Sequence, residues 1–171
     1  VSLDSVHFPF DAAHYIGEIS VRVQNEHPEA MKKSGVNVEA SFILGGQIGL
    51  GEHEIYLIYP QGNYISTSDE TPYLQIGETK YGKPILDRIV TPQTSLEDAA
   101  RCALVSEDST MRSNISVGPP LELLIYRADS LGVDTRLLLK PQSPLYKKLQ
   151  KTWNEGLRHV FERLPRFDWE Q

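Results

Sequence analysis

Two short runs of strand-forming residues, each stopped by glycine or proline, constrain the fold of this chain most. Residues 38–44 are stopped by Gly45-Gly46, and residues 54–59 are stopped by a proline that begins the turn sequence 60–63. A third run resumes at 64–65. Because strands joined by short turns pair antiparallel, this pattern predicts an antiparallel strand meander.

Amphipathic helices are predicted on both sides of the meander. In residues 11–26, Asp11 is suited to cap the helix, apolar residues recur at three- and four-residue spacing, and the helix ends before Pro28. Residues 79–89 predict a second, short helix. Pro84 must lie in its first turn or kink it, since proline cannot donate a backbone hydrogen bond.

The second half of the chain predicts helix, two strands and helix. The sequence 94–98 resembles a capping box and begins a helix, and residues 121–126 form a strand that pairs with 136–139. Ser143-Pro144 begins a long amphipathic helix over 143–164. With no repeat and no linker, residues 1–171 form one α+β domain with antiparallel strands and segregated helices.

Composition excludes several classes of protein. The net charge is −6, which disfavours a nucleic-acid binder. No apolar run reaches the ~20 residues of a membrane span. The single cysteine, Cys102, excludes an internal disulfide and a multi-cysteine metal site, and it favours a reducing, cytoplasmic location.

Few residues suggest chemistry on their own. The glycines between 45 and 51 do not match a phosphate-binding motif. His14 and Glu18 lie one helical turn apart but have no third metal ligand at a recognisable spacing. Between 106 and 120, hydroxyl residues gather at the end of a helix. They are either caps and turns, or a polar pocket that supports a nucleophile elsewhere.

Several segments in a fixed order resemble the β-type subunits of proteasomes. Residues 38–46 and 55–64 resemble the central hairpin of that family. The runs 75–88 and 109–118 look most like the bacterial proteasome-related group called Anbu. No single motif is specific, but the resemblance covers nearly the whole chain.

This resemblance implies an N-terminal-nucleophile hydrolase fold, a four-layer αββα sandwich. Members are peptidases in which an N-terminal Thr, Ser or Cys attacks the peptide bond and its free α-amino group acts as general base. The resemblance also implies a ring or open helical array of identical subunits, a peptide or protein substrate, and no cofactor or metal. It leaves open whether an ATP-dependent unfoldase is a partner.

The family places its nucleophile, aspartate and lysine ahead of the helix that matches 11–26. The chain starts at Val1, just before that helix, and Val1 has no nucleophilic side chain. We therefore expect an N-terminally incomplete domain whose first strands and nucleophile lie outside this chain.

Four residues match the supporting shell of the family's site: Gly77, Glu78, Ser113 and Ser116. The family's Gly-Ser pair reads Gly77-Glu78 here, and its Arg-Asp-x-x-Ser motif reads Arg-Ser-Asn-Ile-Ser at 112–116. Ser116 matches the serine, whereas Ser113 replaces the aspartate. Asp108, about one helical turn earlier, is a fallback carboxylate.

Three functions remain open from the sequence. The first is a peptidase subunit, the second a noncatalytic assembly subunit with the same fold, and the third a small-molecule amidase. In the first two, we expect the helix over 143–164 to lie at a subunit interface.

Overall fold

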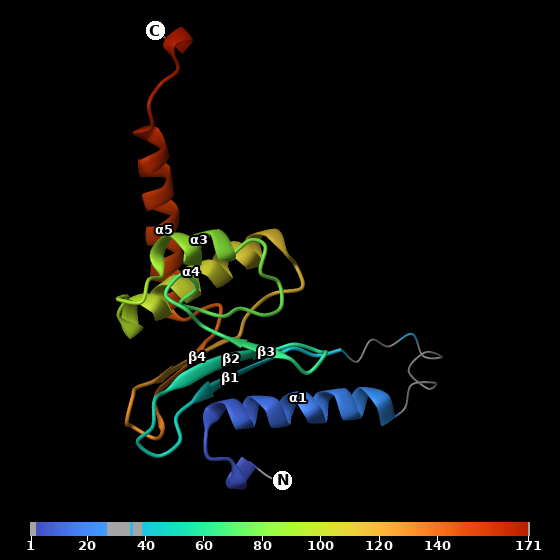
Figure 1. Ribbon diagram of the computed structural model, residues 1–171. Helices are drawn as coiled ribbons and strands as arrows, with labels where there is room; N and C mark the ends of the chain where they lie inside the picture. Colours follow the sequence, from blue (N-terminus) through green and yellow to red (C-terminus); the bar gives the residue numbers. More distant parts are fainter. Residues whose placement is uncertain (1–2, 27–34, 36–38, 171) are drawn as a thin grey trace.

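The computed structural model describes residues 3–26, 35 and 39–170 (Figure 1). The start of the predicted strand at 38–44 lies outside the described residues. In chain order the helices and strands are α1 (Pro9–Glu26), β1 (Phe42–Gly46), β2 (Glu54–Ile58), β3 (Tyr64–Ser66), α3 (Lys83–Ile89), α4 (Leu96–Ser113), β4 (Leu121–Tyr126), β5 (Val133–Leu139) and α5 (Pro144–Glu162), with short 3-10 helices at Leu3–Ser5 and Asp168–Glu170.

The predicted meander is confirmed as a three-stranded antiparallel sheet in the order β1-β2-β3. Ile58 is fully buried and pairs with Phe42 on one side and Tyr64 on the other. The prediction that Gly45-Gly46 stops the first strand is wrong, because both glycines belong to β1 and pair with β2. Pairing through the backbone needs no side chain, so the partner strand outweighs the low strand propensity of glycine.

Helix α1 packs on this sheet. Ala13 of α1 is fully buried against Tyr56 and Ile58 of β2. Gly17 approaches the turn after β2 so closely that a Cβ atom there would lie 2.2 Å from the carbonyl oxygen of Gly62. The helix begins at Pro9, so Asp11 lies in its first turn instead of capping it, where a carboxylate still favours the helix dipole.

Helices α3 and α4 pack against each other at a second glycine. A Cβ atom on Gly82 would lie 2.1 Å from the Ser106 hydroxyl of α4. Helix α3 begins at Lys83, four residues later than the 79–89 prediction, and Pro84 lies in its first turn as expected. The predicted start of α4 is confirmed, since Ser95 caps it by accepting a hydrogen bond from the Asp98 N–H at 3.1 Å.

The second sheet is the antiparallel pair β4-β5. Strand β5 begins at Val133, earlier than the prediction of 136–139, because it pairs along the full length of β4. Leu104 of α4, Leu139 of β5 and Tyr146 of α5 form a core that is separate from the core under α1. This core fixes α4 and the first turns of α5 on the sheet.

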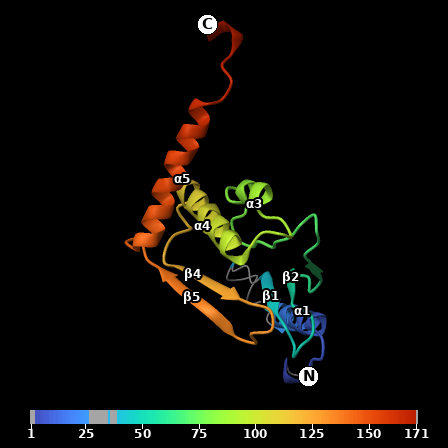
Figure 2. The ribbon, with the colours of Figure 1, turned by 90° about the vertical axis from the view of Figure 1, so that its left-hand side faces the viewer.

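Gln47 joins the loops at the ends of the two sheets. Its Oε1 atom accepts a hydrogen bond from the Tyr126 hydroxyl at 3.0 Å and one from the Asp129 N–H at 2.8 Å. Its Nε2 atom donates to the Asp129 carboxylate at 2.7 Å. Figures 1 and 2 show the resulting order, with α1 on one side of the strands and α3 and α4 on the opposite side. Helices therefore lie on both sides of the strands and are not segregated to one face, contrary to the prediction from the sequence.

Helix α5 extends away from the rest of the chain and carries the C-terminal tail with it (Figures 1 and 2). Its predicted start is confirmed, with Pro144 in the first turn. Ser143 does not cap the helix with its side chain; its hydroxyl accepts a hydrogen bond from the Lys140 N–H at 2.9 Å and closes the preceding turn. No helix in the described part of the chain is both long and apolar enough to span a membrane.

We predict that Gly17→Ala destabilises the protein, because the added methyl group overlaps the Gly62 carbonyl. The expected loss in the free energy of unfolding is about 1–3 kcal/mol. Gly156→Ala is the matched control: it lies inside α5 with no atom within 4 Å of its Cβ position. The free energy of unfolding of that variant should rise by roughly 0.5–1 kcal/mol, because alanine favours a helix more than glycine does. Denaturant unfolding measures the change in the free energy of unfolding of both variants. Equal changes would contradict the close packing of α1 on the turn after β2.

Candidate functional site

The candidate site lies where the end of α4 meets the segment before α3. Asn114 is the first residue after α4, and its N–H donates to the Thr110 carbonyl at 2.8 Å, which continues the helix by one bond. Its side chain Nδ2 donates to Oε2 of Glu78 at 3.0 Å. This bond connects two segments that are 36 residues apart in the sequence.

The oxygen atom of the same side-chain amide binds Ser116. The Asn114 Oδ1 atom accepts a hydrogen bond from the Ser116 N–H at 2.9 Å and one from the Ser116 hydroxyl at 2.7 Å. The amide nitrogen faces a carboxylate and the amide oxygen faces two donors, so each end has the partner that its chemistry requires. Glu78, Asn114 and Ser116 are called the Glu78 cluster below.

Gly77 lets the chain turn into the cluster. Its φ angle is +80°, in the left-handed region that residues with a Cβ atom adopt only with strain. On the other side of Glu78, Oε1 accepts a hydrogen bond from the Lys80 N–H at 3.2 Å. Both carboxylate oxygens of Glu78 are thus held, one by Lys80 and the other by Asn114. The structure therefore brings three of the four predicted residues, Gly77, Glu78 and Ser116, into one place.

Ser113 is not joined to them. It is the last residue of α4, its side chain is exposed, and in the described part of the chain no hydrogen bond connects it with the Glu78 cluster. Asn114, the next residue, makes the connection instead. Asn114 lies within the 109–118 run that resembles Anbu, and the sequence alone predicts no role for it. Its position at the end of a helix, where an asparagine side chain can bond to nearby backbone groups, is the signal that could have identified it.

Asp108, the fallback carboxylate, has other partners. It is 2% exposed, and its Oδ2 atom lies 3.1 Å from Nε of Arg112. Its Oδ1 atom accepts a hydrogen bond from Gln150 of α5. Because both oxygens are engaged, Asp108 links α4 to α5 and does not serve as the fallback.

Two hydroxyl groups of α4 make local bonds, whereas Ser116 of the same hydroxyl-rich segment belongs to the Glu78 cluster. The hydroxyls of Ser109 and Thr110 each donate to the carbonyl four residues earlier, at 3.0 Å. Cys102 is buried with a weak contact to the Ile85 carbonyl, and burial raises the pKa of its thiol. It lacks the lowered pKa of a reactive cysteine.

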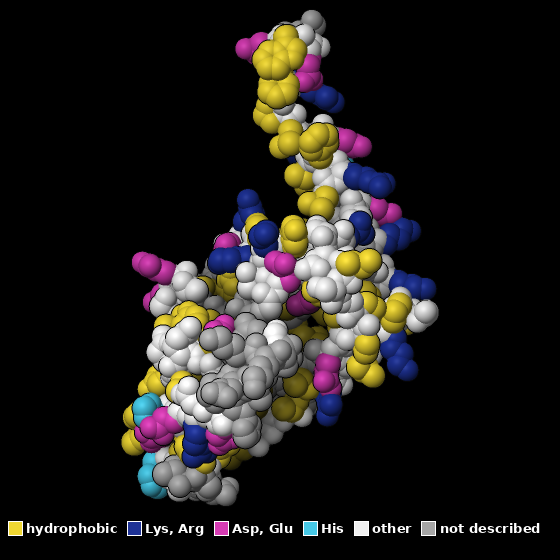
Figure 3. Space-filling view, turned by 90° about the vertical axis from the view of Figure 1, so that its right-hand side faces the viewer, with side chains coloured by type: hydrophobic (Ala, Val, Ile, Leu, Met, Phe, Trp, Pro, Cys, Tyr) yellow, Lys and Arg dark blue, Asp and Glu magenta, His cyan; other side chains and the backbone are white. Residues whose placement is uncertain are grey.

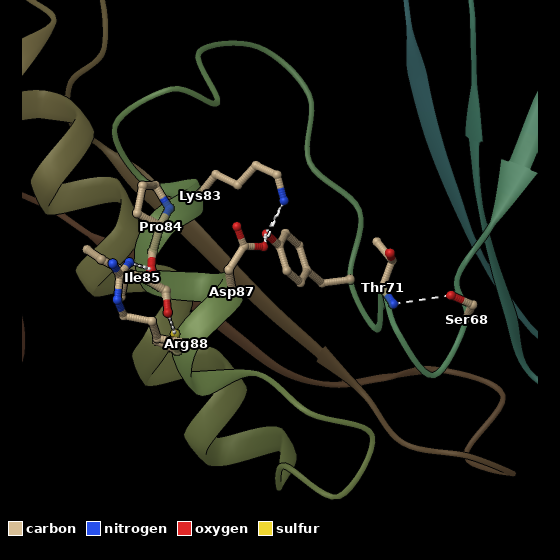
Figure 4. Close-up of polar contacts among 9 residues, drawn as sticks. Ser68, Thr71, Lys83, Pro84, Ile85, Asp87 and Arg88 are labelled. Atoms are coloured by element: carbon tan, nitrogen blue, oxygen red, sulfur yellow. Dashed lines mark hydrogen bonds and ion pairs between the residues drawn. The ribbon is translucent and has the colours of Figure 1, made fainter.

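A second polar group ties the preceding loop to α3 (Figure 4). Lys83 Nζ lies 2.7 Å from Oδ1 of Asp87, and the Tyr73 hydroxyl donates to the same oxygen. The Lys83 ammonium lowers the pKa of the Asp87 carboxyl, and burial raises the pKa of Tyr73. Figure 4 also shows Ser68 and Thr71 closing a turn in that loop. The group anchors the loop that leads to Gly77.

In the described part of the chain, His14 and Glu18 do not form a metal site with a third ligand. His14 Nε2 lies 3.4 Å from Oε1 of Glu18, and about two thirds of each side chain is exposed. Among the described residues, no three His, Cys, Asp or Glu side chains gather as a metal site requires.

Solved structures of Anbu proteins match this chain closely. Anbu (ancestral beta-subunit) from Yersinia bercovieri is 40% identical with a TM-score of 0.89, and the match covers 98% of this chain and 69% of that one. The Anbu (Gly-1) mutant from Hyphomicrobium sp. strain MC1 is 36% identical (TM-score 0.88; 98% and 68% covered). The helical assembly of the Anbu complex from Pseudomonas aeruginosa is 43% identical (TM-score 0.86; 95% and 67% covered). A scan against protein-family models and a search of curated proteins gave no match.

The Glu78 cluster predicts a pH-dependent effect of Asn114→Asp. This change places a second carboxylate beside Glu78 and removes the N–H donor, so like charges repel. The repulsion raises the pKa of the pair in the folded state, and the folded protein then binds more protons than the unfolded one. We expect a loss of about 1–3 kcal/mol in the free energy of unfolding at pH 7, which shrinks as the pH falls towards 4.

Glu78→Gln in the Asn114→Asp background is the control, because the glutamine amide supplies a donor where the carboxylate had been. It should restore most of the stability at pH 7 and remove the pH dependence. If denaturant unfolding gives the same loss at every pH in both variants, the two side chains do not interact.

Proposed function

The chain belongs to the Anbu family of proteasome-related proteins, and from this we propose that the whole protein is one subunit of a self-assembling peptidase. The observation that carries the proposal is the Glu78 cluster, since two of its three residues occupy positions of the family's supporting motifs. The proposed nucleophile is the N-terminal Thr, Ser or Cys of the mature, full-length protein. The chain spans 69% of the Yersinia structure, so the activity is proposed for the whole protein.

The chemistry requires a base and a fixed amine. A hydroxyl group is a weak nucleophile at neutral pH, and a free α-amino group can take its proton if the amine is held in place and uncharged. Ser116 is suited to hold such an amine, because its hydroxyl hydrogen is directed to Asn114 and its oxygen lone pairs remain available as acceptors. Asn114 therefore sets the direction of the Ser116 hydroxyl.

We include the four-layer αββα sandwich in this proposal. The order of the layers supports the sandwich: α1 lies on one side of the strands, and α3 and α4 lie on the other (Figure 1). On the outward face of β4 and β5, Leu124 and Leu138 are 52% and 56% exposed. The Glu122–Arg136 ion pair lies on the same face, so the two leucines mark a mixed surface that another layer can cover. We propose that this face is covered within the sandwich of the whole protein.

Helix α5 is the proposed contact between identical subunits. Figure 3 shows hydrophobic side chains along one side of the projecting helix and over the tail, with charged side chains on the other side. Within that stripe Leu157 is 50% exposed and Phe161 is 74% exposed, and in the tail Trp169 is 78% exposed. A second copy of the chain is the occupant that the relatives support, because the Pseudomonas protein is described as a helical assembly.

A noncatalytic assembly subunit is the second candidate. The observation that favours it is Ser113, which replaces the family's aspartate and is not connected with the Glu78 cluster. Glu78 also replaces the family's serine. Both changes alter the charge around the place where the amine would lie.

The peptidase proposal predicts a covalent adduct on the N-terminal residue of the full-length protein. We expect intact mass and N-terminal sequencing to locate an epoxyketone or β-lactone on a Thr, Ser or Cys at the mature N-terminus. Ser116→Ala should slow adduct formation about tenfold, because one hydrogen bond to the amine is lost. Ser113→Ala is the matched control and should leave the rate within about twofold.

Two results would separate the candidates. Folded, assembled protein that forms no adduct and has another residue at its mature N-terminus would overturn the peptidase proposal and support the assembly subunit. If the adduct forms at the same rate in Ser116→Ala and in the unchanged protein, the peptidase proposal stands. The proposed role of the Glu78 cluster is then contradicted.

We predict that Leu157→Gln together with Phe161→Gln weakens assembly. Burying a large apolar side chain contributes about 1.5–3 kcal/mol, so two polar replacements should lower the association constant at least 100-fold. Lys151→Gln together with Glu155→Gln is the control, because it removes an exposed ion pair from the same helix. Light scattering and circular dichroism measure mass and folding, and an unchanged mass in the apolar double variant would contradict the interface.

Point substitutions test this interface better than removal of 143–171. That deletion would also remove Tyr146, which is 2% exposed, and Leu149, which packs on the same core. The truncated chain would lose part of the α4–α5 core, and loss of assembly would then have two explanations. Leu157 and Phe161 lie on the projecting part of α5 and take no part in that core.

A further inference from the structure

An open groove of about 490 Å³ lies where α3, α4 and α5 meet, and it is called the Trp153 groove below. Its apolar lining consists of Ile89 at the end of α3, Cys102 and Val105 of α4, and Trp153 of α5. Cys102 and Val105 are buried, Trp153 is half-buried and Ile89 is 41% exposed. The other lining residues are polar: Gln93, Thr94, Ser95, Asp98 and Arg101. Buried apolar residues together with largely exposed polar ones are typical of a surface that binds another protein.

The groove lies on the apolar face of α5, at the point where the body of the protein stops covering that face. Tyr146 and Leu149, on the first turns, pack in the core with α4 and β5. Trp153 lines the groove, and beyond it Leu157 and Phe161 are exposed. Because residues three or four apart lie on one side of a helix, these five side chains form one continuous apolar stripe. A partner that covers Leu157 and Phe161 therefore lies directly beside the groove.

The C-terminal tail carries an aromatic pair beyond the other end of this stripe. The rings of Phe167 and Trp169 stack with their centroids 4.4 Å apart, and the two residues are 59% and 78% exposed. Trp153 and Glu162, the last residue of α5, are about 14 Å apart along the helix axis. Figures 1 and 2 show the tail at the far end of α5, away from α3 and α4. The chain's own tail therefore does not fill its groove.

The groove is large enough for this aromatic pair. A cavity of about 150 Å³ holds one benzene ring, so about 490 Å³ accommodates the phenyl ring of Phe167 and the indole of Trp169 together. Because the rings are already stacked in the free tail, docking costs little side-chain freedom. Aromatic side chains seated in a pocket are also the contacts that contribute most to many protein interfaces.

We propose that the Trp153 groove receives Phe167 and Trp169 of a second copy of this chain, and that the α5 helices of the two copies lie antiparallel. In an antiparallel pair, the tail end of each apolar stripe lies against the groove end of the other. In a parallel pair, tail would lie against tail, and both grooves would stay open. The inference rests on the proposed contact through α5 and names the surface that receives it.

A second copy fits the groove for two reasons. The apolar stripe of α5 runs into the groove without a break, so a copy that covers the stripe also reaches the groove. The contact is reciprocal, because each copy gives its tail and receives the tail of the other, so two identical chains satisfy both surfaces at once. The related Pseudomonas protein is described as a helical assembly. A peptidase and a noncatalytic subunit would share this contact.

Disulfide trapping between two full-length variants tests the docking. One variant carries Gln93→Cys at the groove, the other carries Asp168→Cys between the two tail aromatics, and the native cysteines of both are replaced by alanine. A disulfide needs Cα atoms within about 7 Å, so we expect a covalent dimer that contains one chain of each variant. Lys151→Cys in place of Gln93→Cys is the matched control, because it lies on the opposite side of α5 from Trp153. It should cross-link slowly or not at all.

Truncation of the tail aromatics tests their contribution to assembly. Phe167→Ala together with Trp169→Ala should fold normally, since both side chains are exposed, and should lower the association constant about 30-fold or more. Arg166→Gln together with Glu170→Gln is the control, because it removes an exposed ion pair from the same tail and keeps the rings. Ile89→Gln in the groove should weaken assembly as well, and adding it to the tail variant should have little further effect.

Three results would overturn the docking, and light scattering distinguishes them. If Leu157→Gln with Phe161→Gln weakens assembly but the tail and groove variants do not, the α5 contact stands and the docking is wrong. If a disulfide forms only inside a single chain that carries both Gln93→Cys and Asp168→Cys, the tail folds back onto its own groove. A full-length protein that stays monomeric would contradict both the assembly and the docking.

Discussion

The burial of α4 is the interaction on which the rest of this structure depends. Its side chains pack on three neighbours at once, with Leu104 against β5 and α5 and with Ser106 against Gly82, which directly precedes α3. A helix that is buried on several sides can shift only if all of its neighbours shift, since protein interiors are close-packed. The end of α4 is therefore a fixed point, and the Glu78 cluster is built on it.

Two polar groups of α4 and its end use this fixed point differently. At Asn114 the helix has just ended, so a side-chain amide can reach across to Glu78 and back to Ser116. Six residues earlier, the buried Asp108 is held between Arg112 and Gln150, which aligns α4 with α5. A buried carboxylate needs such partners, because leaving it unpaired in the interior would cost several kcal/mol, on the order of 3–5.

Local patterns predicted most of the fold. The meander, the cap at Ser95 and the proline start of α5 follow from turn residues, hydrophobic periodicity and capping, which act over a few neighbouring residues. The errors lie where pairing or packing outweighs local preference. Gly45-Gly46 continues β1 because β2 pairs with it, and β5 starts early because β4 offers backbone partners along its whole length. The candidate site followed only in part, since Glu78 and Ser116 were predicted but Asn114, which joins them, was not.

The sequence by itself determined the α+β class, the order of the elements and membership of the Anbu family, because these depend on short-range patterns and on motifs in a fixed order. Only the tertiary structure decided which polar groups meet. Glu78 and Asn114 are 36 residues apart, and Asp108 and Gln150 are 42 apart. A hydrogen bond needs its two atoms within about 3.2 Å, and only the packing of α4 against α3 and α5 places them that close.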